Sequence, residues 1–156
     1  MIKIVLPGTP IRKKSTRFFF RRGRAGGQNT QKGEMNVLRW QIKAQHPGPP
    51  LQGIVSVITF LYFPFPSRIS KKKKQQLATE RVYSQKKIDN DNCEKIYFDC
   101  LKETIFTDDS LIVQNFTVKI YSEDPRVEFY IKQIPDYAPT PREMVNLLYG
   151  TTDENI

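Results

Sequence analysis

The residue types that could do chemistry gather in one short stretch, KKIDNDNCEK at residues 86–95, where carboxylates and amides lie between lysines. A second acidic pair follows downstream, so the oxygen donors to be explained are Asp89, Asn90, Asp91, Asn92, Asp108 and Asp109. Three explanations compete: a capped helix start, a calcium-binding loop, and a metal centre that hydrolyses phosphodiesters. They differ in how many of these residues they need.

A calcium loop of the EF-hand type is excluded by its spacing. Such a loop needs oxygen ligands at positions 1, 3 and 5, glycine at position 6 and glutamate at position 12. With Asp89 first, the third position is Asp91 and fits. The fifth, sixth and twelfth positions fail, because they are Cys93, Glu94 and Cys100.

Helix capping explains part of the stretch. Asp91 or Asn92 directly before an amphipathic run is a good N-cap, because its side-chain oxygen accepts a hydrogen bond from a free N–H of the first turn. The helix dipole also favours a carboxylate there. One cap explains one residue, however, and leaves Asp89 and the pair Asp108-Asp109 without a role.

A metal centre uses all of these carboxylates. In phosphodiester hydrolysis a divalent cation lowers the pKa of its bound water and neutralises the charge that develops on the phosphate. Magnesium prefers hard oxygen ligands, commonly a few carboxylates with the other positions left to water and phosphate. Lys95, one turn into the expected helix, is placed to reach the scissile phosphate as a point charge.

The bulk composition favours an anionic partner. The chain has 156 residues, enough for one domain, with a formal net charge of +9 and a sequence pI near 9.6. Such a charge favours nucleic acid or an acidic membrane surface. No stretch approaches the ~20 apolar residues that span a bilayer. Cys93 and Cys100 are expected about 10 Å apart on one helix, beyond disulfide reach, as small buried hydrophobes in a reducing, cytoplasmic compartment.

Periodicity and breakers predict the elements that position these residues. Strands are expected at 2–6, 53–63, 111–121 and 127–134, helices at 35–46 and 92–104, and shorter helices at 70–79 and 142–149. The order β-α-β-α-β-β predicts an α+β fold, a single compact domain whose mixed sheet packs against helices. Residues 1–134 are expected to form this domain and residues 135–156 a C-terminal extension.

A basic, aromatic segment precedes the first expected helix. It holds Phe18-Phe19-Phe20 among arginines and lysines, and the first acidic residue of the chain is Glu34. Its glycines predict a segment that is mobile until a ligand binds, and its composition suits an arm that follows a DNA backbone and stacks on bases. The alternative is an ordinary hairpin whose phenylalanines reach the core. With the lysine-rich connection before Asp89, the residues expected to contact DNA are Arg12, Lys13, Lys14, Arg17, Arg21, Arg22, Lys71, Lys72, Lys73 and Lys87.

The segment KKIDNDNCEKIYFDCLKETIFTDDSLIVQNFTVKIYSEDPRVEFYI resembles the core of the RusA-type Holliday junction resolvases. The usual pattern of that family is Lys-Pro-Asp-x-Asp-Asn-x-x-Lys, then Phe/Leu-Asp-x-Leu, then Asp-Asp-x-x-Val/Ile before a strand that ends near a lysine. The chain matches it at Lys87, Asp89, Asp91, Asn92, Lys95, Phe98, Asp99, Leu101, Asp108, Asp109, Ile112 and Lys119. Ile88 replaces the usual proline and Cys93 an apolar residue, and neither change removes a metal ligand.

The resemblance implies roles for single residues. The essential acids, which would bind the metal, fall on Asp89, Asp91 and Asp109, and the catalytic lysine falls on Lys95. Asn92 and Asp108 are implied as supports that orient the ligands or surround them. Asp99 also matches, but pairing with Lys95 or Lys102 on the helix surface explains it equally well. The implied cofactor is Mg²⁺, with Mn²⁺ as a substitute.

The implied function is that of a structure-selective endodeoxyribonuclease, which resolves Holliday junctions by paired cuts in DNA recombination and repair and leaves 5′-phosphate ends. Its implied partners are branched DNA and a second copy of itself in a homodimer, with no membrane. The implied setting is the bacterial cytoplasm, often with a phage or prophage origin. Two alternatives stay open: a non-catalytic protein that binds branched DNA with the same fold, and an interaction module whose acids only cap a helix and fill a loop.

Overall fold

The computed structural model describes residues 1–15, 17–21, 23–28 and 30–150, without the side chains of residues 17, 21 and 28. Its centre is a four-stranded sheet in the order β1-β6-β4-β5. The strands are β1 (Ile2–Pro7), β4 (Val55–Pro64), β5 (Ile112–Ser122) and β6 (Arg126–Gln133). Only the pair β4–β5 is parallel, while β1–β6 and β4–β6 are antiparallel. The predicted α+β fold with a mixed sheet is thereby confirmed.

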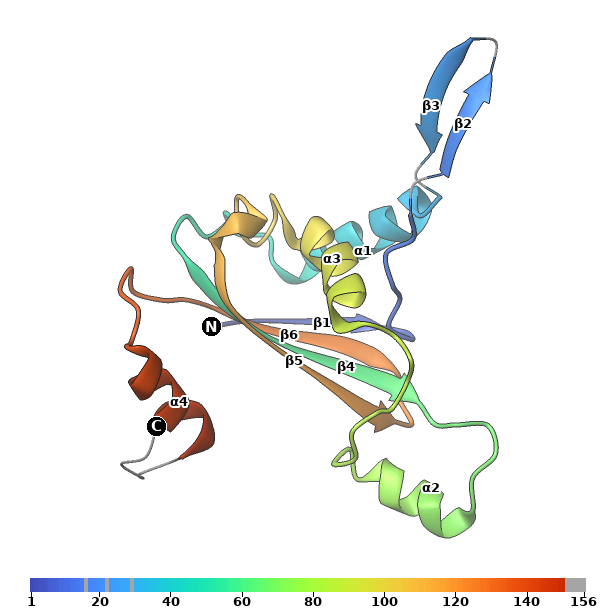
Figure 1. Ribbon diagram of the computed structural model, residues 1–156, viewed down its shortest axis with the longest axis vertical. Coiled ribbons are helices and arrows are strands. Elements are labelled where there is room, and N and C mark those ends of the chain that lie inside the picture. The colour runs from blue at the N-terminus through green and yellow to red at the C-terminus, as the bar shows by residue number, and fades with distance from the viewer. Residues whose placement is uncertain (16, 22, 29, 151–156) are drawn as a thin grey trace.

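Two helices, α1 (Lys32–Gln45) and α3 (Asn90–Leu101), cover one face of this sheet (Figure 1). Alternate residues of the strands point toward them, as the period of a half-buried strand requires. The largest fully buried side chains are Phe63, Phe106, Phe129, Ile4, Leu6, Ile42, Leu61, Leu77, Ile96, Leu101, Ile105 and Ile131. This core fixes α3, and with it the acidic stretch, on the sheet.

The face of β5 under α3 is polar. Thr59 of β4 is fully buried on the helix-covered face and pairs in register with Thr117, so the alternating residues of β5 that share this face include Asn115 and Lys119. Phe116, on the opposite face, is 56% exposed. Polar side chains of β5 therefore point toward the acidic end of α3.

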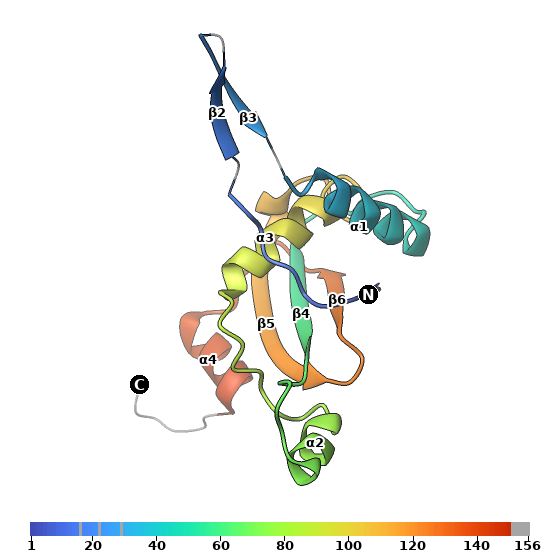
Figure 2. The ribbon, with the colours of Figure 1, turned by 90° about the vertical axis from the view of Figure 1, so that its right-hand side faces the viewer.

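Three smaller elements extend from the domain. The hairpin of β2 (Arg17–Arg21) and β3 (Arg24–Gln28) projects from one end of the long axis, and α2 (Lys71–Ala78) lies at the other (Figures 1 and 2). The helix α4 (Pro141–Tyr149) follows the last strand and begins with a capping box between Thr140 and Glu143. None of the described helices is long and apolar enough to cross a membrane. The domain division at residue 134 stays a prediction.

Three details of the prediction were wrong. The expected element order lacked the hairpin. The alternative, a hairpin whose phenylalanines reach the core, has the hairpin right and the phenylalanines wrong, because Phe18, Phe19 and Phe20 are exposed. The expected helix 92–104 begins two residues earlier and ends at Leu101. It ends there because Glu103 has a left-handed φ of +67° and its N–H bonds to the carbonyl of the buried Phe106.

Candidate active site

The start of α3 presents a carboxylate that does not cap the helix. Asp89 is the N-cap residue, with an extended backbone at φ −69° and ψ 135°, yet its side chain makes no capping hydrogen bond. Its Oδ2 instead accepts a hydrogen bond from Asn92 Nδ2 at 3.4 Å. The predicted cap at Asp91 or Asn92 is wrong, because both lie inside the first helical turn. Capping therefore does not account for Asp89.

Asp91 and Lys95 lie one turn apart and form an ion pair. Lys95 Nζ is 3.2 Å from Asp91 Oδ2, and both side chains are mostly exposed. The hydrogen bond from Lys95 holds the pKa of Asp91 below its usual value. A carboxylate and an ammonium thus share one exposed surface at the start of α3, as the helical spacing predicted.

The segment that leads to Asp89 is fixed to the edge of β5. Ser84 N–H donates to the carbonyl of Lys119, and Tyr121 N–H donates to that of Val82. Lys119 also reaches back with its ammonium, which lies 3.1 Å from the carbonyl oxygen of Ile88. This backbone bracing, together with partial burial of Ile88 against the core, fixes the residue directly before Asp89.

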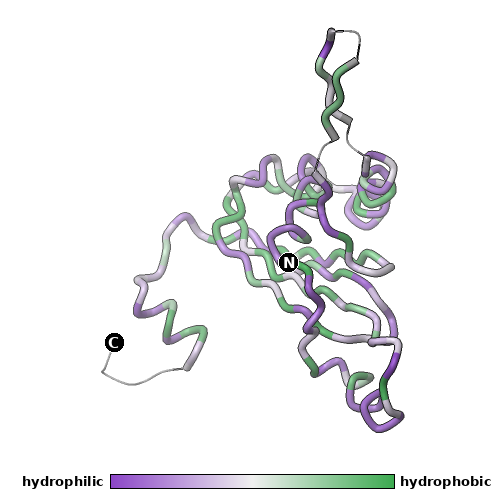
Figure 3. The backbone as a smooth tube through the Cα atoms, turned by 45° about the vertical axis from the view of Figure 1, so that its right-hand side comes forward, coloured by the Kyte–Doolittle hydropathy of each residue, from purple (hydrophilic) through white to green (hydrophobic). Residues whose placement is uncertain are grey.

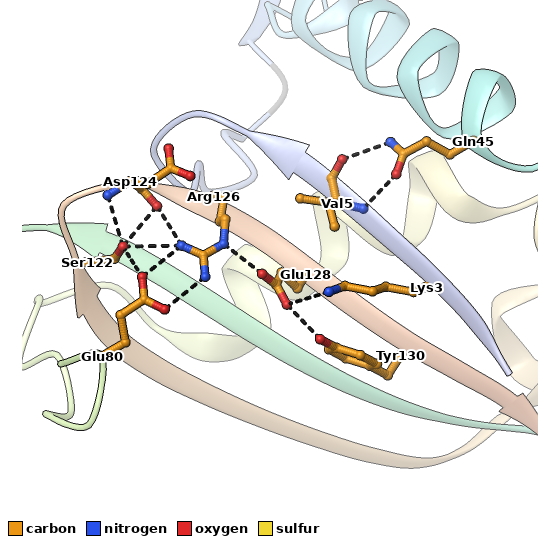
Figure 4. A network of polar contacts seen from close by, with 9 residues as sticks. All are labelled: Lys3, Val5, Gln45, Glu80, Ser122, Asp124, Arg126, Glu128 and Tyr130. Carbon is orange, nitrogen blue, oxygen red and sulfur yellow. Dashed lines mark hydrogen bonds and ion pairs between the residues drawn. The ribbon is translucent and has the colours of Figure 1, made fainter. Parts of the chain in front are cut away.

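A partly buried ionic network ties the same segment to the sheet from its other end (Figure 4). The Arg126 guanidinium donates to both oxygens of Glu80 at 2.9 Å and to Glu128 at 2.7 Å. It also lies 3.7 Å from the ring centroid of Tyr62. Glu80 has a left-handed φ of +54°, a conformation that costs a non-glycine residue about 1–2 kcal/mol. These contacts hold the turn after α2 in place.

The second acidic pair lies at the far end of α3. Asp108 Oδ1 accepts a hydrogen bond from Ser110 N–H and caps the short helix η1 (Asp109–Leu111). Lys102, which follows the last residue of α3, is 2.5 Å from Asp108 and 3.5 Å from Asp109. The hydrogen bond from Lys102, helped by that from Ser110, lowers the pKa of Asp108 far below its usual range.

The predicted metal ligands are consequently divided within one chain. Asp89 and Asp91 lie at the start of α3, whereas Asp109 lies beside Lys102 at its end. The 12 residues of α3 separate these ends by about 18 Å, while two oxygens on one magnesium ion are about 3–4 Å apart. Within the described ranges, no three His, Cys, Asp or Glu side chains are grouped closely enough to hold a metal ion.

A basic groove adjoins the start of α3. Its lining includes Arg12, Lys14 and Lys87, and one carboxylate, that of Glu34 in α1, which lies 3.7 Å from Lys14 Nζ. A neighbouring hollow is lined by Lys13, Lys14, Ser15 and Asn92. Arg12, Lys13, Lys14 and Lys87, all predicted to contact DNA, therefore lie next to the acidic stretch.

The other predicted DNA contacts lie farther away. Lys71, Lys72 and Lys73 are exposed on α2, at the opposite end of the molecule from the hairpin (Figure 1). Arg17 and Arg21 belong to β2, but their side chains, like all of Arg22, lie outside the described residues. The basic groups thus flank the acidic stretch on both sides along the long axis.

Three residues have contacts that the sequence did not reveal. Asp99 pairs with Lys13 Nζ at 2.6 Å, so its predicted pairing with Lys95 or Lys102 is wrong. Lys13 N–H also donates to the carbonyl of Asn92, which fastens the basic segment along α3. Asn115 Nδ2 donates to Glu94 at 2.7 Å, close to the acidic stretch. The polar alternation of β5 was the one signal that pointed to Asn115.

The cysteines are not nucleophiles. Cys93 and Cys100 are fully buried, and burial raises the pKa of each thiol to about 11. Their predicted place in the core is confirmed. His46 is partly buried, with Nε2 3.3 Å from the Pro49 carbonyl oxygen, outside the acidic stretch.

Comparisons with known proteins place the chain in a family. Residues 7–132 match the family model described as endodeoxyribonuclease RusA, which covers most of the chain. The Bacillus subtilis protein YqaN, described as uncharacterized, is 31% identical over 137 residues, which are 85% of this chain and 96% of YqaN. The matched range includes the whole of α3, both acidic pairs and the basic groove.

Proposed function

This chain is a member of the RusA endodeoxyribonuclease family, and we propose that it is a Mg²⁺-dependent nuclease that resolves Holliday junctions. The paired cuts leave 5′-phosphate ends, in the service of DNA recombination and repair in the bacterial cytoplasm. The observation that carries the proposal is the start of α3. There Asp89 has a carboxylate that caps nothing, and Asp91 is paired with Lys95 beside a basic groove.

The donor set fits a hard cation. Asp89 and Asp91 offer carboxylate oxygens at an exposed helix start, and the low pKa of Asp91 keeps it ionised at neutral pH. Such oxygens suit Mg²⁺, with Mn²⁺ as a substitute. When bound, the metal lowers the pKa of a water and neutralises charge on the phosphate. Asn92 orients Asp89 through its amide, and Lys119 fixes the backbone before it.

Lys95 and the basic groove act on the substrate. The Lys95 side chain is 59% exposed and pivots on a flexible stem, so its ammonium can move from Asp91 to a phosphate oxygen. Arg12, Lys14 and Lys87 line a path for the DNA backbone that leads past Asp89. They attract a polyanion to a cluster of carboxylates that would otherwise repel it.

Asp109 joins the other acids in a homodimer. Within its own chain it lies beside Lys102, at the other end of α3 from Asp89 and Asp91, so we infer that a second copy supplies it. A two-fold axis that sets α3 of one chain antiparallel to α3 of its partner places the end of one helix beside the start of the other. Because such contacts are self-complementary, the pairing forms two equivalent sites. Two opposed sites suit a four-way junction, in which two strands are cut.

Cleavage of a synthetic four-way junction in Mg²⁺ tests the proposal. We expect the parent to cut two opposed strands, and Asp91→Asn and Lys95→Ala to lose cutting while they keep junction binding in EDTA. The matched controls are Asp136→Asn and Lys43→Ala, which change exposed residues outside the site. If the parent binds the junction and never cuts it, the chain is a non-catalytic protein that binds branched DNA. Equal cutting by the parent and both site variants would contradict the proposed roles of Asp91 and Lys95.

A further inference from the structure

The β2–β3 hairpin carries exposed aromatic rings. Phe18 is 85% exposed, Phe19 50% and Phe20 76%, on a ribbon that projects from the domain (Figure 2). Figure 3 shows hydrophobic (green) stretches on this hairpin, which projects away from the sheet. Exposure of phenylalanine rings to water is energetically unfavourable. A cluster of exposed rings therefore marks a contact surface.

The two faces of the hairpin differ. Phe19 pairs with Gly26, and a Cβ added at Gly26 would lie 2.7 Å from its ring, so this ring lies across the facing strand. Phe18 and Phe20 lie on the other face, where their partners in register are Gly27 and Ala25. No large side chain opposes them, so these two rings are bare.

The spacing of these two rings matches a stacked base. Residues two apart on an antiparallel strand are about 6.8 Å apart. Stacked planar groups are about 3.4 Å apart, the rise between bases in DNA. One base therefore fits between Phe18 and Phe20 with a ring on each side. Aromatic side chains that receive bases in this way bind nucleic acid with little dependence on sequence.

The sequence of this segment is basic, which favours an anionic ligand. The hairpin contains Arg17, Arg21, Arg22 and Arg24, and no acidic residue precedes Glu34. The hairpin also continues directly from Lys13 and Lys14, which lie beside Asn92. A DNA strand bound in the basic groove at the start of α3 therefore continues along the hairpin.

We propose that Phe18 and Phe20 form a clamp for an unpaired DNA base at the branch point, next to the strand to be cut. The proposal rests on the proposed function, since it names how that site selects branched DNA. Bases at a branch are the least stacked in the substrate, so taking one between two rings costs less there than within a duplex. The clamp therefore favours branched over continuous DNA.

Binding without metal tests the clamp separately from cleavage. We compare the full-length parent with Phe18→Ala/Phe20→Ala on two fluorescent single strands in EDTA, one of thymidines and one of abasic sites with the same number of phosphates. On the thymidine strand we expect the double variant to bind at least about fivefold more weakly, because each stacked base contributes roughly 1–3 kcal/mol. On the abasic strand we expect the two proteins to bind equally.

Each other outcome overturns the clamp. Equal affinity for both strands in parent and variant means that the rings do not contact bases. Equal weakening on both strands means that the substitutions disturb the hairpin or its charges rather than stacking. A changed oligomeric state in size-exclusion chromatography, with unchanged DNA binding, assigns the rings to a second copy of the chain. If the parent does not cut a junction in Mg²⁺, the proposed nuclease function is contradicted. The binding comparison in EDTA does not depend on cleavage and still tests the clamp.

Discussion

Replacement of Arg126 by methionine tests how the segment before the candidate site is held. The Arg126 side chain is 17% exposed and binds Glu128, whose side chain is 9% exposed, and Glu80, whose side chain is 34% exposed. Without the guanidinium, Glu128 keeps a buried charge with Tyr130 and the exposed Lys3 as its remaining partners. Breaking a buried pair in this way costs about 3–5 kcal/mol, and the more exposed Glu80 adds little.

Urea unfolding followed by circular dichroism and by tryptophan fluorescence measures this loss. For a domain of this size, 3–5 kcal/mol corresponds to a fall in Tm of roughly 6–20 °C. The matched control is Arg142→Met on the exposed surface of α4, which we expect to change stability by less than about 0.5 kcal/mol. A loss below about 1 kcal/mol for Arg126→Met refutes the importance of the network.

The pH dependence of this variant has a definite sign. Hydrogen bonds from Arg126 lower the pKa of Glu80 below its usual 4.5. Burial raises the pKa of Glu128, but bonds from Arg126 and Tyr130 and the charge of Lys3 outweigh it, so this pKa is also lowered. Lowered carboxyl pKa values stabilise the fold above the unfolded pKa, and the gain is lost as pH falls through the folded pKa. The difference between parent and Arg126→Met should therefore be full at pH 7 and shrink below pH 4.5.

Three further outcomes are expected. Lys119→Met removes the ammonium that braces the Ile88 carbonyl, so junction cutting should fall about 10- to 100-fold while binding in EDTA stays within twofold; unchanged cutting would deny Lys119 a positioning role. Cys93 and Cys100, with pKa values of about 11, should resist a thiol reagent at pH 8 until the chain unfolds, and rapid labelling of the native protein would contradict their burial. Lys71→Gln should lower the slope of log affinity against log salt by about 0.9 if α2 contacts duplex DNA, and an identical slope would place the DNA elsewhere.

The sequence predicted the regular parts of the fold because their signals are local. The dense β-branched and aromatic residues of 53–63 and the alternation in 127–134 predicted strands, and the spacing of Met35, Leu38 and Ile42 predicted a helix. The structure has these elements within a few residues. The hairpin was not predicted as an element, because β3 contains two glycines and the phenylalanines of β2 are exposed. Without burial the periodic signal of a strand is absent.

The candidate site was predicted in part for a similar reason. The spacing of Asp91 and Lys95 is a local helical property, and their ion pair confirms it. The partner of Asp99 depends on how the N-terminal segment packs against α3, which no spacing within the helix reveals. The distance between Asp89 and Asp109 depends on the direction of the chain after α3. The roles of these residues in metal binding and catalysis stay predictions.

A heterodimer of one Asp91→Asn chain and one Asp109→Asn chain tests whether two chains share each active site. Asp91→Asn and Asp109→Asn chains with different affinity tags are produced together, and the mixed dimer is purified by both tags. If each site takes Asp89 and Asp91 from one chain and Asp109 from the other, one site in this dimer carries both substitutions and the other carries neither. We expect each variant alone to be inactive, the mixed dimer to nick one strand of a four-way junction in Mg²⁺, and the parent to cut two. A mixed dimer as inactive as either variant, beside an active parent, would contradict the shared site.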